Sequence, residues 1–141
     1  MAAAQLVRRE NWSNWPLDDP AARLVGGRCR ECRRLWFPRA TVCPGCLARD
    51  SMAPVELSNR GSLYSFSILH IGPSTFDAPY AVAYVDLREG MRVFGHLDGW
   101  KEATPRLGSA LRIYGGVIGR SPGGEALVGV RFKAEPRATA A

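Results

Sequence analysis

Residues 26–50 read GGRCRECRRLWFPRATVCPGCLARD, and this stretch decides how the first part of the chain is held together. It contains two C-x-x-C units, Cys29 with Cys32 and Cys43 with Cys46, separated by ten residues. Tetrahedral zinc takes four thiolates at about 2.3 Å, and each C-x-x-C turn presents two sulfurs on one side. The two turns together predict one four-thiolate metal site.

Other uses of the four cysteines fit this spacing less well. A redox C-x-x-C opens a helix after a strand and does not come twice, and accidental buried thiols would not repeat one spacing. An iron centre with four thiolates, as in rubredoxin, stays open beside zinc, which is the commoner structural use of such a site. Because four thiolates leave no open coordination position, the metal is expected to be structural.

Two expectations concern the backbone around the cysteines. Gly45 is expected to supply the positive φ that the second turn needs, with Pro44 fixing the turn before it. The run from Leu35 to Pro38 is expected to form a short hairpin that covers the metal.

The composition is that of a globular protein, with 141 residues, 46% hydrophobic and 23% charged. No apolar run approaches the roughly 20 residues of a membrane span, and the start lacks the order of a signal peptide, so a cytoplasmic protein without a membrane partner is expected. The formal net charge of +6 permits anionic partners. Five arginines of this excess cluster around the cysteines: Arg28, Arg30, Arg33, Arg34 and Arg39.

From about Val55 onward, apolar residues recur with period two, which predicts β-strands. The expected strands are residues 62–70, 79–87, 91–97, 111–118 and 126–132. Glycines inside these runs, such as Gly95 and Gly129, permit the bends that closure of a small barrel needs. The sequence therefore predicts a mainly β protein whose last domain is a five-stranded OB-fold barrel.

The expected domains are a helical N-terminal arm (residues 1–26), a rubredoxin-like zinc ribbon (27–54), the OB-fold barrel (55–135) and a tail (136–141). Within the arm, Asp18-Asp19-Pro20 has the character of a helix start, and Trp12 and Trp15 must pack on the rest of the chain or on another protein. The connection over residues 71–78 exceeds a hairpin turn and carries Phe76, so it is expected to be a functional loop.

Standard enzyme signatures are absent from the sequence, which contains no nucleophile elbow, phosphate loop, dinucleotide fingerprint or zinc-protease helix. We interpret His70 and His96 as satisfied histidines within strands, and Asp86 and Glu89 as residues of a turn. No catalytic residue is assigned. Single-stranded nucleic-acid binding remains an alternative, disfavoured because few of the Lys and Arg residues after Val55 are closely spaced. Its stacking platform would be Tyr64, Phe66, Tyr80, Tyr84 and Phe94.

The succession of motifs resembles the DUF35 family, zinc-ribbon and OB-fold proteins associated with acyl-CoA enzymes. The resemblance rests on the Trp-bearing arm, the ribbon with Pro38-Arg39 between its cysteine pairs, GSLYSFS at residues 61–67 and PYAVAYVDLREG at residues 79–90. The ribbon alone is generic, but this order is specific and covers nearly the whole chain.

The resemblance implies a non-catalytic subunit of a hetero-oligomer with a thiolase-superfamily enzyme or, as a second alternative, with an acyl-CoA hydratase or aldolase. The active-site residues would then belong to the partner. Such a subunit helps assemble the complex and shapes or extends the acyl-CoA site, and some family members bridge two enzymes. The five ribbon arginines become candidate contacts for the phosphates of coenzyme A. Candidate partner contacts are Trp12, Trp15, Trp36, Phe37 and Phe76.

Overall fold

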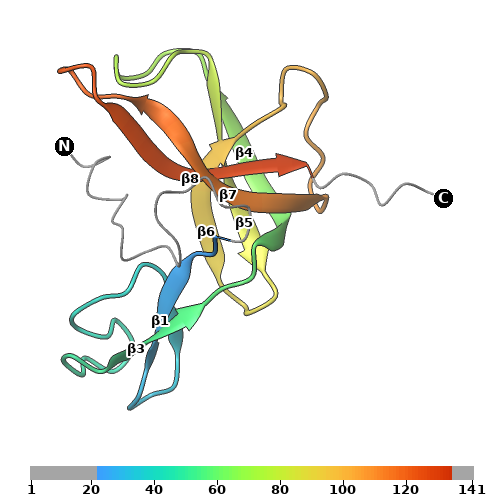
Figure 1. Cartoon of the computed structure of the whole chain (residues 1–141). Helices are drawn as coiled ribbons and strands as arrows, with labels where there is room; N and C mark the ends of the chain where they lie inside the picture. The colour runs from blue at the N-terminus through green and yellow to red at the C-terminus, as the bar shows by residue number, and fades with distance from the viewer. Residues whose placement is uncertain (1–21, 135–141) are drawn as a thin grey trace.

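The computed structural model describes residues 22–134, which form a small sheet and a barrel (Figure 1). In the small sheet, β1 (Val25–Cys29) pairs with β2 (Leu35–Trp36) on one side and with β3 (Met52–Glu56) on the other, both antiparallel. Of the run from Leu35 to Pro38, which was expected to form a hairpin, only Leu35 and Trp36 form a strand, and it pairs with β1. Because β1 ends at the first metal-site cysteine, the sheet carries the cysteine turns at one of its ends.

The barrel is closed by five strands in the order β4-β5-β6-β8-β7, and β4 pairs with β7 to complete it. All neighbours are antiparallel except β6 and β8. This confirms the mainly β fold and the five-stranded barrel. The bounds are β4 (Arg60–Leu69), β5 (Tyr80–Leu87), β6 (Arg92–Leu97), β7 (Ala110–Arg120) and β8 (Ala126–Ala134).

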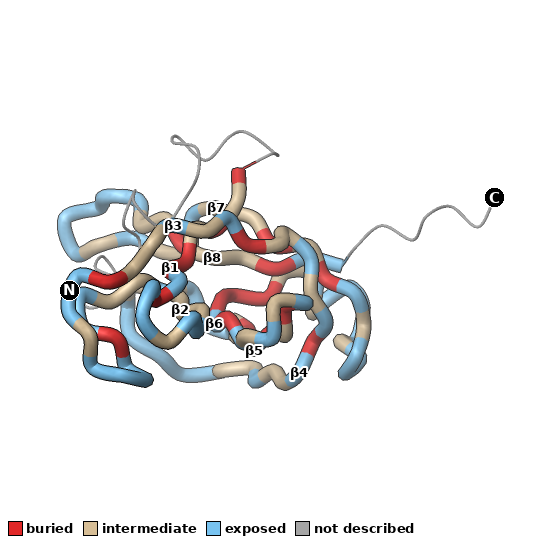
Figure 2. Tube along the Cα trace, turned by 90° about the horizontal axis from the view of Figure 1, so that it is seen from below, coloured by how far each residue is buried: buried red, intermediate tan, exposed pale blue. Residues whose placement is uncertain are grey.

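The core of the barrel is built from the inward-facing residues of these alternating strands. Val85, Phe132 and Ile113 are among its most buried side chains, and Figure 2 shows the buried stretches concentrated in the barrel strands. Leu24 and Leu57, which flank the small sheet in sequence, belong to the same cluster, and the N–H of Leu57 donates to the C=O of Leu24 at 2.8 Å. Shared burial of these two leucines anchors the small sheet to the barrel.

A bulge in β4 overturns part of the period-two assignment. The sequence places Leu63 on the face opposite Phe66, yet both side chains pack in the core. The register shifts between Leu63 and Ser65, so Tyr64 is an extra residue and the strand reverses its faces there. Phe66 is thereby removed from the proposed stacking platform.

Two other expectations change in the described part of the chain. The predicted helical arm lies largely outside the described residues, and its described remainder is not helical, because β1 already begins at Val25. His70 follows the end of β4 and is exposed, so its placement as a strand histidine is wrong. Residues 22–134 contain no helix that could cross a membrane.

Candidate metal centre and barrel cavities

The two cysteine turns have the same backbone construction. In the first, the N–H of Cys29 donates to the C=O of Arg34 at 2.9 Å, and the N–H of Arg33 donates to the C=O of Cys29 at 2.8 Å. In the second, Cys43 donates to Ala48 and Leu47 donates to Cys43, both at 2.9 Å. Equivalent hydrogen bonds five and four residues apart place both cysteine pairs in the same orientation toward one point.

The positive φ in each turn falls on the residue after its second cysteine. Arg33 has φ 68° and Leu47 has φ 65°, whereas Gly45 is not among the residues with positive φ. The prediction for Gly45 is therefore wrong. Gly45 is instead packed closely, because a Cβ there would lie 3.1 Å from Nη1 of Arg34 and 3.3 Å from the Trp36 ring.

The four cysteine sulfurs lie within 4.8 Å of one another and form the candidate metal centre. Sγ of Cys29 is 3.6 Å from that of Cys46, and Sγ of Cys32 is 3.6 Å from that of Cys43. Sulfurs at the corners of a tetrahedron with zinc–sulfur bonds of 2.3 Å stand about 3.8 Å apart. The sulfur cage fits a tetrahedral ion with four thiolate ligands, and this supports a structural zinc site.

Hydrogen bonds already favour thiolates at part of this cage. The backbone N–H of Cys32, and after it the hydroxyl of Ser51, lowers the pKa of Cys29 to about 6. Burial raises the pKa of Cys43, but the N–H groups of Cys46 and Gly45 outweigh it, so that pKa is lowered too. These donors stabilise the charged ligands that a divalent cation needs.

The fourth thiol responds in the opposite sense. Although the backbone N–H of Ala48 lowers the pKa of Cys46, desolvation and the neighbouring sulfurs together raise it to about 12. Four sulfurs in close contact cannot all carry charge without a cation, so this one keeps its proton. A bound divalent metal would remove that repulsion and take all four residues as thiolates.

The five ribbon arginines do not form one cluster. Arg28 is exposed on β1 and donates to the C=O of Arg33 at 2.7 Å, while Arg30 is exposed in the first turn. Arg34 is exposed with its stem over Gly45, and Arg39 is half-buried against Gly27. Arg28, Arg30, Arg33 and Arg34 therefore present charge to solvent around the metal centre, and Arg39 packs inside the module.

An apolar groove of about 530 Å³ runs over the outer side of β5 and β6, toward β8. Phe37 and Pro38 of the ribbon line it, and so does Phe76 of the loop between β4 and β5. Its wall between these residues is lined by Val82, Tyr84, Phe94, His96, Ile118 and Val130. Hereafter "the groove" means this cavity. Two of the predicted partner contacts, Phe37 and Phe76, thus lie in one surface feature.

A cluster of three rings separates the groove from a second cavity. The Phe76 ring centroid is 5.2 Å from that of Tyr80 and 4.8 Å from that of His96, and Tyr80 stacks on His96 at 5.6 Å. Burial, and then the charge of Arg131, lowers the pKa of His96, with Asp98 acting in the opposite direction. His96 thus lies within a strand, as predicted, and its lowered pKa favours the neutral ring.

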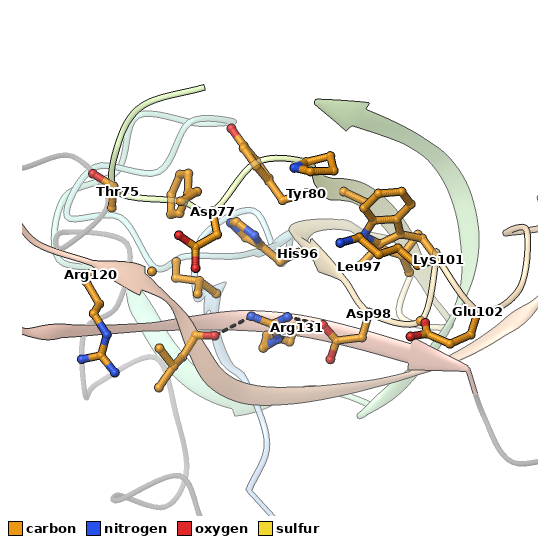
Figure 3. A pocket seen from close by; sticks show the side chains of 18 of the residues that line it. Thr75, Asp77, Tyr80, His96, Leu97, Asp98, Lys101, Glu102, Arg120 and Arg131 are labelled. Atoms are coloured by element: carbon orange, nitrogen blue, oxygen red, sulfur yellow. Dashed lines mark hydrogen bonds and ion pairs between the residues drawn. The ribbon is translucent and has the colours of Figure 1, made fainter. Parts of the chain in front are cut away.

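The second cavity, of about 660 Å³, is polar and lies between the 74–80 loop, the start of the β6–β7 connection and the β7–β8 hairpin (Figure 3). Asp98 lines it and accepts hydrogen bonds from Tyr114 and from Nε of Arg131, the latter at 3.0 Å. Arg131 also donates to the C=O of Val117. Asp98 and Arg131 are thus hydrogen-bonded to each other, and each also bonds to a residue of β7, Tyr114 and Val117 respectively.

No pattern in the sequence indicated this polar cluster. Asp98 and Arg131 are 33 residues apart, and only the parallel pairing of β6 with β8 brings them together. Trp100 and Lys101 line the same cavity from the connection after β6 and were not singled out either. Of the other predicted contacts, Trp12 and Trp15 lie outside the described residues. The half-buried Trp36 has an indole N–H without a hydrogen-bond partner in residues 22–134.

Comparisons with protein families match two parts of the chain. The family model described as ChsH2, rubredoxin-like zinc ribbon domain, matches residues 19–51. The model described as ChsH2, C-terminal OB-fold domain, matches residues 54–116. The two matched ranges contain all four cysteines and the first three barrel strands.

Two curated proteins are similar to a little over half of the chain. The benzoylsuccinyl-CoA thiolase subunit BbsA of Thauera aromatica is 43% identical over 84 residues, which are 60% of this chain and 58% of that protein. A DUF35 domain-containing scaffold protein of Methanocaldococcus jannaschii is 36% identical over 76 residues, 52% of this chain and 54% of that protein. The chain thus spans somewhat more than half the length of these relatives.

A solved structure extends the similarity to most of the fold. The structure named Ltp2-ChsH2(DUF35) aldolase contains a chain that is 31% identical, with a TM-score of 0.63. The match covers 79% of the present chain and 84% of that chain.

Proposed function

The chain belongs to the DUF35 family of zinc-ribbon and OB-fold proteins, and we propose that it is a non-catalytic accessory subunit of an acyl-CoA enzyme. The observation that carries this proposal is the similarity to BbsA, a protein named as a thiolase subunit. The finer form of the proposal is a hetero-oligomer with a thiolase-type enzyme, in which this chain helps assemble the complex and shape the acyl-CoA site.

The chemistry of the described residues supports an accessory role. Four cysteine ligands would close the coordination shell of a bound metal, which would then stabilise the ribbon instead of polarising a substrate. In the polar cavity, the carboxylate of Asp98 accepts hydrogen bonds from Tyr114 and Arg131. A carboxylate that is already bound to a tyrosine and an arginine serves the architecture of the barrel.

The exposed ribbon arginines support a contact with the phosphates of coenzyme A. Arg30, Arg33 and Arg34 present guanidinium groups beside the metal centre, and guanidinium groups bind phosphate through paired N–H donors. The metal would fix these side chains in position by ordering the turns that carry them. Arg39 packs against Gly27, so it is a weaker candidate than the other four.

An aldolase partner is a second candidate. It is favoured by the solved aldolase, whose matched chain is covered to 84%, a larger share than the 58% of the thiolase subunit. Nucleic-acid binding has less support. Such binding requires a positively charged groove beside stacking rings. The rings of Tyr64, Tyr84 and Phe94 are exposed, but the positive charge of the neighbouring Arg92 is paired with Asp86 at 2.6 Å.

The test is a pull-down of the tagged chain from its native lysate at moderate salt, followed by mass spectrometry of proteins that elute in stoichiometric amount. Recovery of a thiolase-superfamily enzyme supports the finer proposal, and recovery of an aldolase or hydratase supports the second candidate. Recovery of nucleic acid that higher salt removes, with no enzyme present, contradicts both.

A further inference from the structure

The four cysteines of the metal centre differ in how far solvent reaches them. Cys29 and Cys43, the first cysteine of each turn, have 0% of their surface exposed. Cys32 is half-buried, and Cys46 is exposed. A reagent in solution therefore meets the centre first at Cys46, because the first cysteines have no accessible surface and Cys32 has less than Cys46.

The residues around Cys46 leave this ligand open and place positive charge beside it. Gly45 before it has no side chain, and Leu47 after it is 73% exposed. The guanidinium of Arg34 is close, since its Nη1 lies 3.1 Å from the position of a Cβ on Gly45. Reactive cysteine thiolates occur in such partly exposed, electropositive surroundings, whereas buried cysteines are inert. As a ligand of a divalent metal, the sulfur of Cys46 is a thiolate.

A second sulfur lies beside that of Cys46. Sγ of Cys29 is 3.6 Å away, although the two residues are 17 apart in sequence and belong to different turns. Cys29 is buried, so reagents in solution do not reach it, but the sulfur of Cys46 does. An accessible cysteine with a second cysteine poised to resolve it is the arrangement found in redox-sensing proteins.

We propose that Cys46 is a modification site at which peroxides oxidise the metal centre, that Cys29 converts the oxidised sulfur into a disulfide, and that the metal is then released. The ribbon thereby loses the ion that orders its two turns, and reduction of the disulfide makes the loss reversible. This inference goes beyond the proposed function and does not depend on it, because it concerns only the ribbon of this chain.

Two steps account for all atoms and electrons. The thiolate of Cys46 attacks one oxygen of hydrogen peroxide, so an S–O bond forms, the O–O bond breaks and hydroxide leaves. The thiolate of Cys29 then attacks the sulfur of this sulfenic acid, so an S–S bond forms, the S–O bond breaks and a second hydroxide leaves. Two protons from solvent convert both hydroxides into water, and the two sulfurs together have given two electrons to the peroxide. The metal is released because Cys32 and Cys43 alone do not complete a tetrahedral site.

Mapping the disulfides of the zinc-loaded full chain tests the inference. The chain is treated with hydrogen peroxide, the remaining thiols are alkylated, and tryptic peptides are identified by tandem mass spectrometry while a chromogenic chelator records released zinc. Trypsin cleaves after Arg30, so Cys29 and Cys32 fall on separate peptides. We expect a Cys29–Cys46 disulfide to form at the rate at which zinc is released, and dithiothreitol with added zinc to restore the centre.

Three results of this mapping would overturn the inference. They are a first disulfide within one turn or between Cys32 and Cys43, zinc release without a disulfide, and zinc that stays bound throughout the treatment.

A matched pair of variants tests the role of exposure. Cys46→His and Cys32→His each keep four ligands, since zinc accepts three cysteines and one histidine, but only the first removes the exposed thiolate. For variants that contain one zinc per chain, peroxide should release zinc about tenfold more slowly from Cys46→His than from Cys32→His. Equal rates contradict the inference. If either variant does not hold zinc, alkylation of the zinc-loaded wild-type chain with iodoacetamide decides instead: labelling of Cys46 before the other three cysteines supports the inference, and labelling of another cysteine first overturns it.

Discussion

At the scale of single residues, the account depends most on the sulfur cage and the groups that orient it. Ser51 is buried, and its hydroxyl lies 3.1 Å from Sγ of Cys29. Hydrogen bonds of this kind position a metal ligand without touching the metal. Ser51 was not singled out in the sequence, because nothing marks a serine 22 residues away as a neighbour of the first cysteine.

Two substitutions separate ligand from supporting residue. Cys43→Ser should abolish stoichiometric zinc binding, because it removes one of four ligands, and the ribbon should unfold with it. Ser51→Ala keeps all four thiolates, so zinc should remain bound with an affinity lowered by about 10- to 100-fold. Zinc content and competition with a chromogenic chelator measure both effects. Full zinc occupancy in Cys43→Ser would contradict the assignment of the site.

His96 gives the barrel a predictable dependence on pH. Burial and Arg131 lower the pKa of His96 below its ordinary value of about 6.5, so the unfolded chain takes up a proton at a higher pH than the folded chain. The free energy of unfolding should therefore be unaffected above pH 7 and fall as pH drops below about 6.5. Urea unfolding between pH 7.5 and 5 measures this, as approximate test conditions. His96→Asn should show a smaller fall, and an equal fall in both proteins would rule His96 out as its cause.

At the scale of elements, the loop between β4 and β5 is fastened to β7 at one point. The N–H of Arg120 donates to the C=O of Thr75 at 3.0 Å. A Cβ on Gly119 would overlap that carbonyl oxygen and lie 2.7 Å from Cδ1 of Phe76. This contact holds Phe76 between the groove and the polar cavity. The loop is therefore packed against the barrel and forms part of its surface.

A matched pair of glycine substitutions tests this contact. Gly119→Ala should lower the free energy of unfolding by about 1–3 kcal/mol, because backbone atoms cannot move aside as a side chain can. Gly123→Ala, in the same hairpin, finds its nearest atom 3.8 Å away and should change stability by less than about 0.5 kcal/mol. Chemical denaturation of both variants provides the comparison. Equal free energies of unfolding for the two variants would show that the loop does not pack tightly against β7 at Gly119.

Local sequence patterns predicted the strands and the metal cage but not the details of their backbone conformation. Period-two alternation located all five barrel strands, since each strand buries one face. It did not predict that the inward-facing and outward-facing positions of β4 exchange at Tyr64. The bulge there depends on the register with β5, which an alternating run of residues does not reveal. The cysteine spacing likewise identified the metal cage, but the positive φ falls on Arg33 and Leu47 rather than on Gly45. Backbone hydrogen bonds, and not residue preference, decide which residue takes that conformation.

At the scale of the whole molecule, the ribbon and the barrel differ in what stabilises them. The barrel has its own core around Val85 and Phe132, whereas the described cysteine turns bury little apart from Cys29 and Cys43. Removing zinc with a chelator should accelerate hydrogen exchange in residues 25–56 and leave residues 111–113 protected. Exchange that accelerates equally in both regions would show that the metal stabilises the fold as one cooperative unit.

The polar cavity and the groove follow from the closed barrel and could not be predicted from the sequence alone. Phe37, Phe76 and Phe94 come from the ribbon, a loop and β6, and they line one groove only because the strands curve around a common core. Strand prediction gives the elements but not the pairing order that places β6 beside β8. The proposed partner-facing surface is accordingly a property of the assembled fold.

The central claim is that the chain assists an acyl-CoA enzyme without catalysing the reaction itself. The most direct measurement compares the rate at which a carbon–carbon bond of an acyl-CoA substrate is cleaved by the chain alone, by its co-purifying enzyme alone and by the two recombined. The account predicts no rate above background for the chain, a weak or absent rate for the enzyme and a restored rate for the mixture. Cleavage by the isolated chain, or an enzyme whose rate is unchanged by adding the chain, would contradict it.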